Sequence, residues 1–338
     1  MNITNARIDI NDTNRVKDYW STVDCSASEK NFYCFPPVRT HSCKLIFNET
    51  DATRRDWCEY WTVEKYLKNN IPFDTVLSIC CGFGEVERTL SKLNVGKKII
   101  GTDIAPGAID TAKKRAYDEN LDNIEYYVAD LQHEQLPENT YDVIWANGAL
   151  HHIKNLDYVI PMLYKSLKSR GYLISNEYVG PNYQQISQRH EELVNAIMHI
   201  LPPEWKDEPY DLYKNAQSFP SKGYRFLKYL LSIQKRTNKF GRLWKKNPKS
   251  YFLRTDPSEC VNSEMIIPLL ENQFETVDVR YFNGSIVMFA LGQAFYNNFD
   301  INNPAHYRLL DLIFQIEDTL VENGEIPDIN AHIICQKR

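Results

Sequence analysis

The chain has 338 residues, a formal net charge of −5 and a hydrophobic content of 43%, which suits a soluble globular protein with one large α/β domain or two smaller ones. Its longest strongly apolar run, residues 285–296, is shorter than the roughly 20 residues that span a bilayer. The first residues lack the basic start and apolar stretch of a signal peptide. We therefore expect a cytoplasmic protein without a transmembrane segment.

Eight cysteines raise the question of a metal site or a disulfide framework. Cys25, Cys34 and Cys43 stand nine residues apart, and Cys80 and Cys81 are adjacent. No CxxC pair occurs, and no Cys/His spacing resembles a zinc site. We predict reduced, mostly buried thiols and no metal ion.

Helical pieces without a repeating pattern occupy residues 1–60, which we expect to form an N-terminal cap. From Phe73 onward, short apolar strands alternate with helices, which is typical of a parallel sheet covered on both faces. Such sheets bind ligands outside the carboxyl ends of their strands. The predicted strands are 74–80, 97–103, 123–130, 141–147 and 171–178, and the helices between them are 85–93, 106–119 and 156–169.

The alternation stops after Gly180. Residues 181–262 contain one clear helix, 185–201, followed by a series of turn signals, and we interpret them as an insertion that forms a lid over the acceptor. Residues 263–338 then supply helices 262–274 and 304–323 and strands 275–282 and 329–338. This order predicts a Rossmann-like seven-stranded sheet with an antiparallel last strand, whose core begins at residues 61–180 and is completed by 263–338.

A glycine turn follows the first strand, in the stretch VLSICCGFGEVERTL from Val76 to Leu90. Glycines at a strand-to-helix junction let a ligand approach the backbone and the helix N-terminus. The dinucleotide fingerprint G-x-G-x-x-G needs a third glycine where Glu87 stands. The acidic pair Glu85 and Glu87 also disfavours a pyrophosphate and suits a ligand that is cationic or lacks phosphate, so NAD is a poor fit.

Polar residues end the next strands at matching positions. Asp103 ends the second strand, where a carboxylate can accept both hydroxyls of a ribose, and Asp130 ends the third. Residues 146–148 follow the fourth strand and would line the far side of the cleft. In this order and at these spacings the motifs resemble the class I S-adenosylmethionine-dependent methyltransferases, over roughly residues 61–177 and the last 75 or so.

The resemblance implies S-adenosylmethionine (SAM) as cofactor and S-adenosylhomocysteine (SAH) as product. It places the methionine part at the glycine turn, the ribose at Asp103 and the adenine near Asp130. Ser78 departs from the family pattern, in which an acid is commoner, so Glu87 or a cap residue is expected to face the cofactor's ammonium. The implied cofactor-binding residues are Ser78, Cys80, Cys81, Gly82, Gly84, Glu87, Asp103, Ile104, Asp130, Leu131, Ala146, Asn147 and Gly148.

Methyl transfer to a hydroxyl needs a base, and four residues are candidates. His151 and His152 follow the fourth strand, but adjacent residues of a helix start point in different directions, so at most one should face the cleft. We favour His151, which is closer to the strand end. Glu177, at the end of the fifth strand, and His190 are expected to reach the same space. The alternative is a histidine pair that only caps and packs the helix start.

The segment after the fifth strand and the long insertion look similar to methyltransferases of bacterial surface-glycan and specialised-metabolite pathways. This similarity implies a sugar or glycan hydroxyl as acceptor, with Tyr178, Tyr183 and Trp205 near the mouth of the site. Two alternatives remain open. One is N- or O-methylation of another small metabolite or of nucleic acid, and the other is an inactive SAM-binding module that serves as a partner subunit.

Residues 222–249 contain ten Lys or Arg, no Asp or Glu, and five interleaved aromatic residues. A run of like charges is most often a solvated face. The absence of acids over this length also fits an anionic partner, such as a phosphate, a nucleotide-sugar, nucleic acid or an anionic membrane surface. We expect the segment to favour an anionic acceptor.

Overall fold

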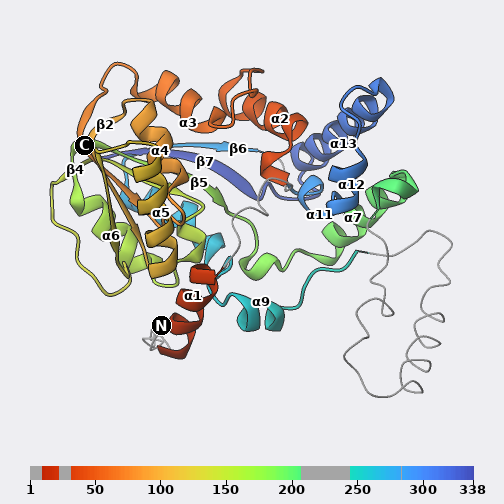
Figure 1. The fold of residues 1–338 in the computed structure, drawn as a ribbon. Helices are drawn as coiled ribbons and strands as arrows, with labels where there is room; N and C mark the ends of the chain where they lie inside the picture. Colours follow the sequence, from red (N-terminus) through yellow and green to blue (C-terminus); the bar gives the residue numbers. More distant parts are fainter. Residues whose placement is uncertain (1–9, 23–31, 207–243, 283) are drawn as a thin grey trace.

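The computed structural model describes residues 10–22, 32–206, 244–282 and 284–338. Its centre is a seven-stranded sheet in the order β3-β2-β1-β4-β5-β7-β6 (Figure 1). The first five strands are parallel, and β7 pairs antiparallel with both β5 and β6, as the sequence predicts. The strands are β1 (Phe73–Ile79), β2 (Gly96–Asp103), β3 (Ile124–Val128), β4 (Tyr141–Asn147), β5 (Leu167–Tyr178), β6 (Thr276–Tyr281) and β7 (Asn330–Gln336).

Helices cover the sheet because its central strands are apolar on both sides, as β4 illustrates with five of seven residues buried. One core lies between the sheet and helices α6 (Leu156–Ser166) and α10 (Ile266–Gln273). A second cluster of buried residues packs α4 (Glu85–Lys92) and the short helix η3 (Val63–Leu67) against the sheet. Helix α5 (Pro106–Asp118) packs on β3 through Tyr126.

A separate hydrophobic core lies beside the sheet and is built from α2 (Pro36–Phe47), α7 (Gln188–Ile200), α11 (Val287–Ala290), α12 (Gln293–Asn298) and α13 (Pro304–Glu322) (Figure 1). Trp205 is fully buried in it, with its ring centroid 5.1 Å from that of Phe295. The expectation that Trp205 lies near the mouth of the site is therefore wrong. Its apolar surface is better satisfied among these aromatic rings.

Within the described residues, helices α1 (Ile10–Thr22), α2 and α3 (Trp57–Thr62) precede β1, and α2 contributes Val38 to the separate core. Helix α1 packs on α5, and α3 packs on α4. From the insertion, α9 (Lys249–Thr255) lies close to α1 in Figure 1, and the Arg15 side chain donates to the Leu253 carbonyl at 2.9 Å. The division into cap, core, insertion and C-terminal completion remains a proposal.

Several other expectations concern regions that are only partly described. Most of the basic segment 222–249 lies outside the described residues, which resume at Trp244. Cys25 lies outside them too, and of the described cysteines Cys43, Cys58, Cys80, Cys81, Cys260 and Cys335 are free. Among the helices described here, none has the length and apolar character to cross a bilayer.

Candidate active site

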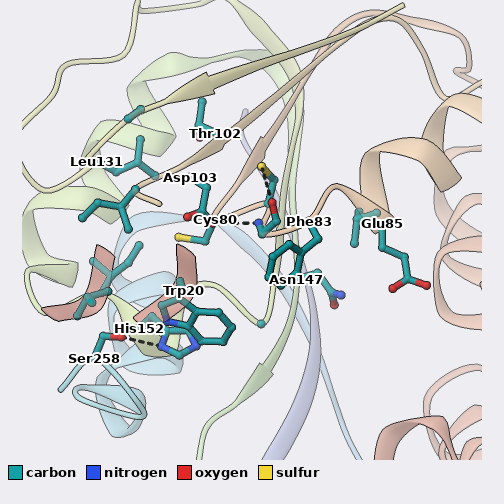
Figure 2. A pocket seen from close by; sticks show the side chains of 18 of the residues that line it. Trp20, Cys80, Phe83, Glu85, Thr102, Asp103, Leu131, Asn147, His152 and Ser258 are labelled. Atoms are coloured by element: carbon teal, nitrogen blue, oxygen red, sulfur yellow. Dashed lines mark hydrogen bonds between the residues drawn. The ribbon is translucent and has the colours of Figure 1, made fainter. Parts of the chain in front are cut away.

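A cavity of about 1470 Å³ lies at the edge where the parallel strands end. Its wall comes from the loops after β1, β2, β3 and β4, from α1 and α3, and from residues 253–261 of the insertion. The carboxyl ends of parallel strands share one edge of the sheet, and Trp20 of α1 and Ser258 of the insertion lie at this edge too. Figure 2 shows Trp20, Cys80, Asp103, His152 and Ser258 around the same space.

The glycine turn lets the backbone form part of this wall. Gly82 and Gly84 have φ of +51° and +75°, which favours glycine. At Gly84 a Cβ would collide with the Tyr126 hydroxyl and come within 2.8 Å of the Ala112 methyl, so glycine is needed for packing as well. Cys80 and Cys81 line the cavity, and burial raises the pKa of both thiols, so they are neutral.

Asp103 joins the glycine turn to the end of β2. One carboxylate oxygen accepts the Gly82 N–H at 2.9 Å, and the other accepts the Ala105 N–H at 2.9 Å. Burial raises the pKa of Asp103, while the two backbone N–H groups favour its ionised form. Each carboxylate oxygen keeps a lone pair, because it has two and the backbone uses one. This carboxylate therefore suits a ligand that offers two hydroxyls.

The structure places most, but not all, of the predicted cofactor residues on the cavity wall. Asp130 lies there, but its carboxylate already accepts the Gln132 N–H at 3.1 Å and contacts His133 at 3.0 Å. On the wall with it are Cys80, Cys81, Gly82, Asp103, Ile104, Leu131, Asn147 and Gly148.

Four predicted cofactor residues lie off the wall: Ser78, Gly84, Glu87 and Ala146. Ser78 and Ala146 are buried within their strands. Glu87 is fully buried on α4, and burial raises its pKa to about 7. It lies in the interior and does not face the cavity, so the geometry gives no support to Glu87 as partner of the cofactor's ammonium. A cap residue is the remaining option.

His151 belongs to the short helix η4 (Leu150–His152) after β4 and is held by Glu177. The carboxylate of Glu177 lies 2.6 Å from His151 Nδ1 and accepts the backbone N–H groups of Ala149 and Leu150, each at 2.8 Å. Burial opposes ionisation of His151, but Glu177 outweighs it and raises the imidazole pKa. Glu177 is thus occupied as a positioning residue and is poorly placed to act as the base.

His152 lies on the cavity wall and is held from the insertion. Its Nδ1 is 3.0 Å from Ser258 Oγ, which donates to Asp256 Oδ1 at 2.6 Å. The indole N–H of Trp20 donates to the other Asp256 oxygen at 3.1 Å, and its ring packs edge-on against His152. Burial and the charge of His151 lower the pKa of His152. His152 is thus the neutral member of the pair.

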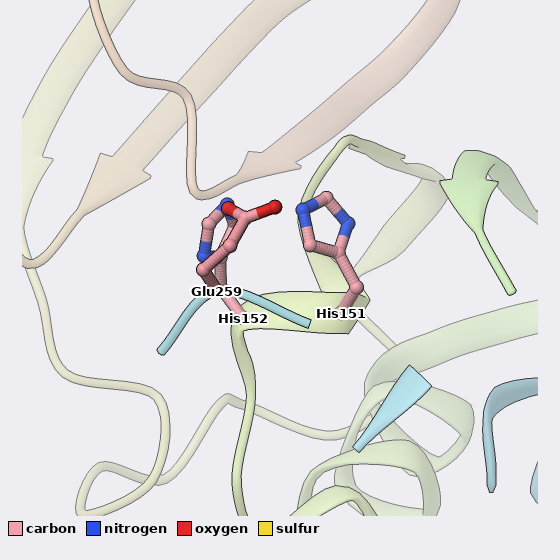
Figure 3. A group of neighbouring side chains, drawn as sticks. All are labelled: His151, His152 and Glu259. Atoms are coloured by element: carbon pink, nitrogen blue, oxygen red, sulfur yellow. The ribbon is translucent and has the colours of Figure 1, made fainter. Parts of the chain in front are cut away.

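Glu259 completes a cluster with the two histidines (Figure 3). Its Oε2 lies 3.8 Å from His152 Nε2, while Gln184 donates to Oε1 at 3.2 Å. Burial opposes ionisation, but the two imidazoles hold the pKa of Glu259 below its usual value. One ligand atom from each residue lies within 4.8 Å of the others, so the cluster could relay a proton or hold a metal ion.

Several sequence expectations about this half of the site need correction. His152, and not the favoured His151, lines the cavity. His190 does not reach the cavity. The residue is buried, and its Nε2 contacts the Ser285 carbonyl beside the separate core that α7 and α11 help to form. Tyr178 is buried with its hydroxyl donating to the Pro181 carbonyl at 3.1 Å. Of the three aromatics expected at the mouth, Tyr183 alone lines the cavity.

Sequence reasoning missed Trp20, Asp256, Ser258 and Glu259. The stretch DPSE at 256–259 predicts a turn, and its side chains are what hold His152 and complete the cluster. A dense group of polar residues inside an insertion was the available signal. Nothing in it identifies His152, 106 residues earlier than Ser258, as the partner.

Part of the chain is similar to known methyltransferases. Residues 73–217 match the model of a methyltransferase domain. A malonyl-[acyl-carrier protein] O-methyltransferase of Bacillus anthracis is 32% identical over 111 residues, which are 33% of this chain and 40% of that protein. A demethylmenaquinone methyltransferase of Oceanobacillus iheyensis is 25% identical over 48% of this chain and 70% of its own length. The chain thus spans less than half of the first relative.

Among solved structures, phosphoethanolamine N-methyltransferase 2 of Haemonchus contortus in complex with SAM is 14% identical. The match covers 94% of this chain and 60% of that one, with a TM-score of 0.42.

Proposed function

We propose that the chain transfers the methyl group of SAM to the oxygen of a small polar acceptor. Its residues 73–217 belong to the class I SAM-dependent methyltransferases. The observation that carries the proposal is one cavity whose wall contains both the glycine turn with Asp103 and the imidazole of His152. The relatives' names include O-, N- and C-methyltransferases. The acceptor atom must therefore be argued from the site.

The residues on the wall fit the cofactor. SAM, when bound, supplies a methyl group on a positively charged sulfur. Gly82 lines the cavity without a side chain, and the buried carboxylate of Asp103 offers acceptors for a ribose diol.

His152 is the proposed proton acceptor. With its Nδ1–H donated to Ser258, the tautomer leaves a lone pair on Nε2, and the lowered pKa keeps the ring neutral. A hydroxyl of the acceptor would give its proton to Nε2 as its oxygen takes the methyl group and the methyl–sulfur bond of SAM breaks to leave SAH. Glu259, at 3.8 Å, would stabilise the imidazolium. An amine acceptor, once deprotonated in solution, needs no such residue. This contrast favours O-methylation.

The narrower proposal is that the acceptor is a sugar or glycan hydroxyl. Tyr183 and Trp20 lie on the wall beside polar groups such as Gln132, Asn147 and Lys154, and aromatic side chains commonly pack against sugar rings. Methylation of another small metabolite or of nucleic acid remains the alternative. A cofactor-binding module without activity is a weaker proposal, because it gives no role to the supported His152.

The test is transfer of label from methyl-labelled SAM to a panel of sugars, nucleotide-sugars, amines and nucleic acid, followed by NMR of the product. We expect an O-methyl product and tight SAH binding. A protein that binds SAH and labels amines alone would overturn the O-methylation proposal. A protein that binds no SAH would overturn methyl transfer altogether.

A further inference from the structure

Two charged side chains of the N-terminal segment line the cavity without serving the chemistry described above. Glu59 lies in the first turn of α3, and Arg39 lies on α2. The Nη1 of Arg39 donates to the Arg54 carbonyl at 3.5 Å, which brings it close to the start of α3. An anion and a cation thus share one wall of the cavity.

Glu59 differs from the acids around it. Asp56 pairs with Arg54 at 2.8 Å, and Glu85 pairs with Arg55 at 2.8 Å. Within the described part of the chain, Glu59 has no ion pair, and its carboxylate hydrogen-bonds only to its own backbone N–H. Burial raises its pKa to about 7, and the charges of Asp56 and Glu85 add to the effect. A half-buried carboxylate near other acids is stabilised by a cation.

In Arg39 it is a hydrogen-bond donor that lacks a partner. Its Nε is buried, and no hydrogen-bond partner is described for it. An unsatisfied buried guanidinium donor costs free energy that an anionic ligand would recover. The wall therefore suits a ligand that carries both a cation and an anion.

The amino-acid end of SAM and SAH has that chemistry, an ammonium and a carboxylate on one carbon. Ser78 supplies no charge where an acid is commoner, and Glu87 does not reach the cavity. We propose that Glu59 binds the cofactor's ammonium and Arg39 its carboxylate, so the cap completes the cofactor site. This inference rests on the proposed function for the identity of the ligand.

Calorimetry with two ligands tests the assignment without any acceptor. SAH carries the amino-acid end, whereas 5′-methylthioadenosine has the same adenosine and thioether without it. We expect Glu59→Gln to weaken SAH binding roughly 10- to 100-fold, as for a lost charged hydrogen bond, and to leave 5′-methylthioadenosine unchanged. Asp103→Asn should weaken both ligands. Glu64→Gln is the matched control, because Glu64 pairs with Lys68 away from the cavity.

A second measurement uses the native protein alone. An ammonium beside Glu59 favours the carboxylate, so SAH binding near pH 7 should release protons. The binding enthalpy should then depend on the ionisation enthalpy of the buffer for SAH and not for 5′-methylthioadenosine. Equal losses for both ligands in Glu59→Gln, or no loss with no proton release, would overturn this inference and leave methyl transfer standing. Failure of native protein to bind either ligand would overturn both.

Discussion

The two halves of the cavity are built in different ways. The half that we propose for the cofactor is made by the loops after β1 to β4, where the backbone of the glycine turn and Asp103 hold each other through local hydrogen bonds. The half that we propose for the acceptor is made by side chains from distant segments: His151 is held by Glu177, and His152 by Ser258 and Asp256. The first half depends on backbone geometry that a sequence pattern encodes. The second depends on tertiary contacts that can change with little effect on the sheet.

Loss of the proton acceptor should give the largest effect and should leave the cofactor half intact. We expect His152→Ala to lower kcat by about 10²- to 10⁴-fold, the usual contribution of a general base. The affinity for SAH, measured by calorimetry, should stay within about twofold. A parallel loss of SAH affinity would mean that the two halves are not separable.

Loss of the ribose carboxylate should have the opposite pattern. Asp103→Asn replaces an ionised acceptor with an amide that can accept through one atom only, so SAH affinity should fall roughly 10- to 100-fold. With SAM at saturation, turnover should change little. Thermal unfolding provides the control, because Asp103 also orders the turn through Gly82 and Ala105. Unchanged SAH affinity would contradict the role of Asp103.

The third prediction tests the coupling inside the acceptor half. The base must be neutral, so turnover should rise with pH through a pKa below the usual value of about 6.5, because burial and the charge of His151 lower the pKa of His152. Removing that charge in His151→Gln lets the pKa of His152 rise, so the acid limb of the profile should move to higher pH. An unmoved limb, or one displaced to lower pH, would exclude His152 as the titrating base.

The smallest expected effect concerns metal ions. If His151, His152 and Glu259 transfer a proton, dialysis against EDTA should leave the rate unchanged, and added divalent ions should not stimulate it. The alternative use of this cluster is to hold a metal ion that binds the acceptor oxygen directly. Loss of activity with EDTA, restored by one divalent ion, would favour that use.

Sequence reasoning predicted the strands and their pairing class, and most residues that it proposed for the cofactor do line the cavity, because hydrophobic periodicity and the residues at strand ends are local signals. It placed Asp103 and the glycine turn in the right loops for that reason. It could not separate His152 from His190, since both are histidines on helices. The position of each histidine depends on the core that its helix joins. His190 packs against Phe289 beside the separate core. Ser258 and Glu259 were equally hidden, because their role exists only once the insertion folds back on η4.

A crystal structure of the SAH complex tests most directly the claim that one cavity joins these halves. The account predicts the ribose hydroxyls on the Asp103 carboxylate and the sulfur facing His152, with no protein atoms between the sulfur and Nε2. A complex in which SAH binds elsewhere, or in which its sulfur is screened from His152, would contradict it.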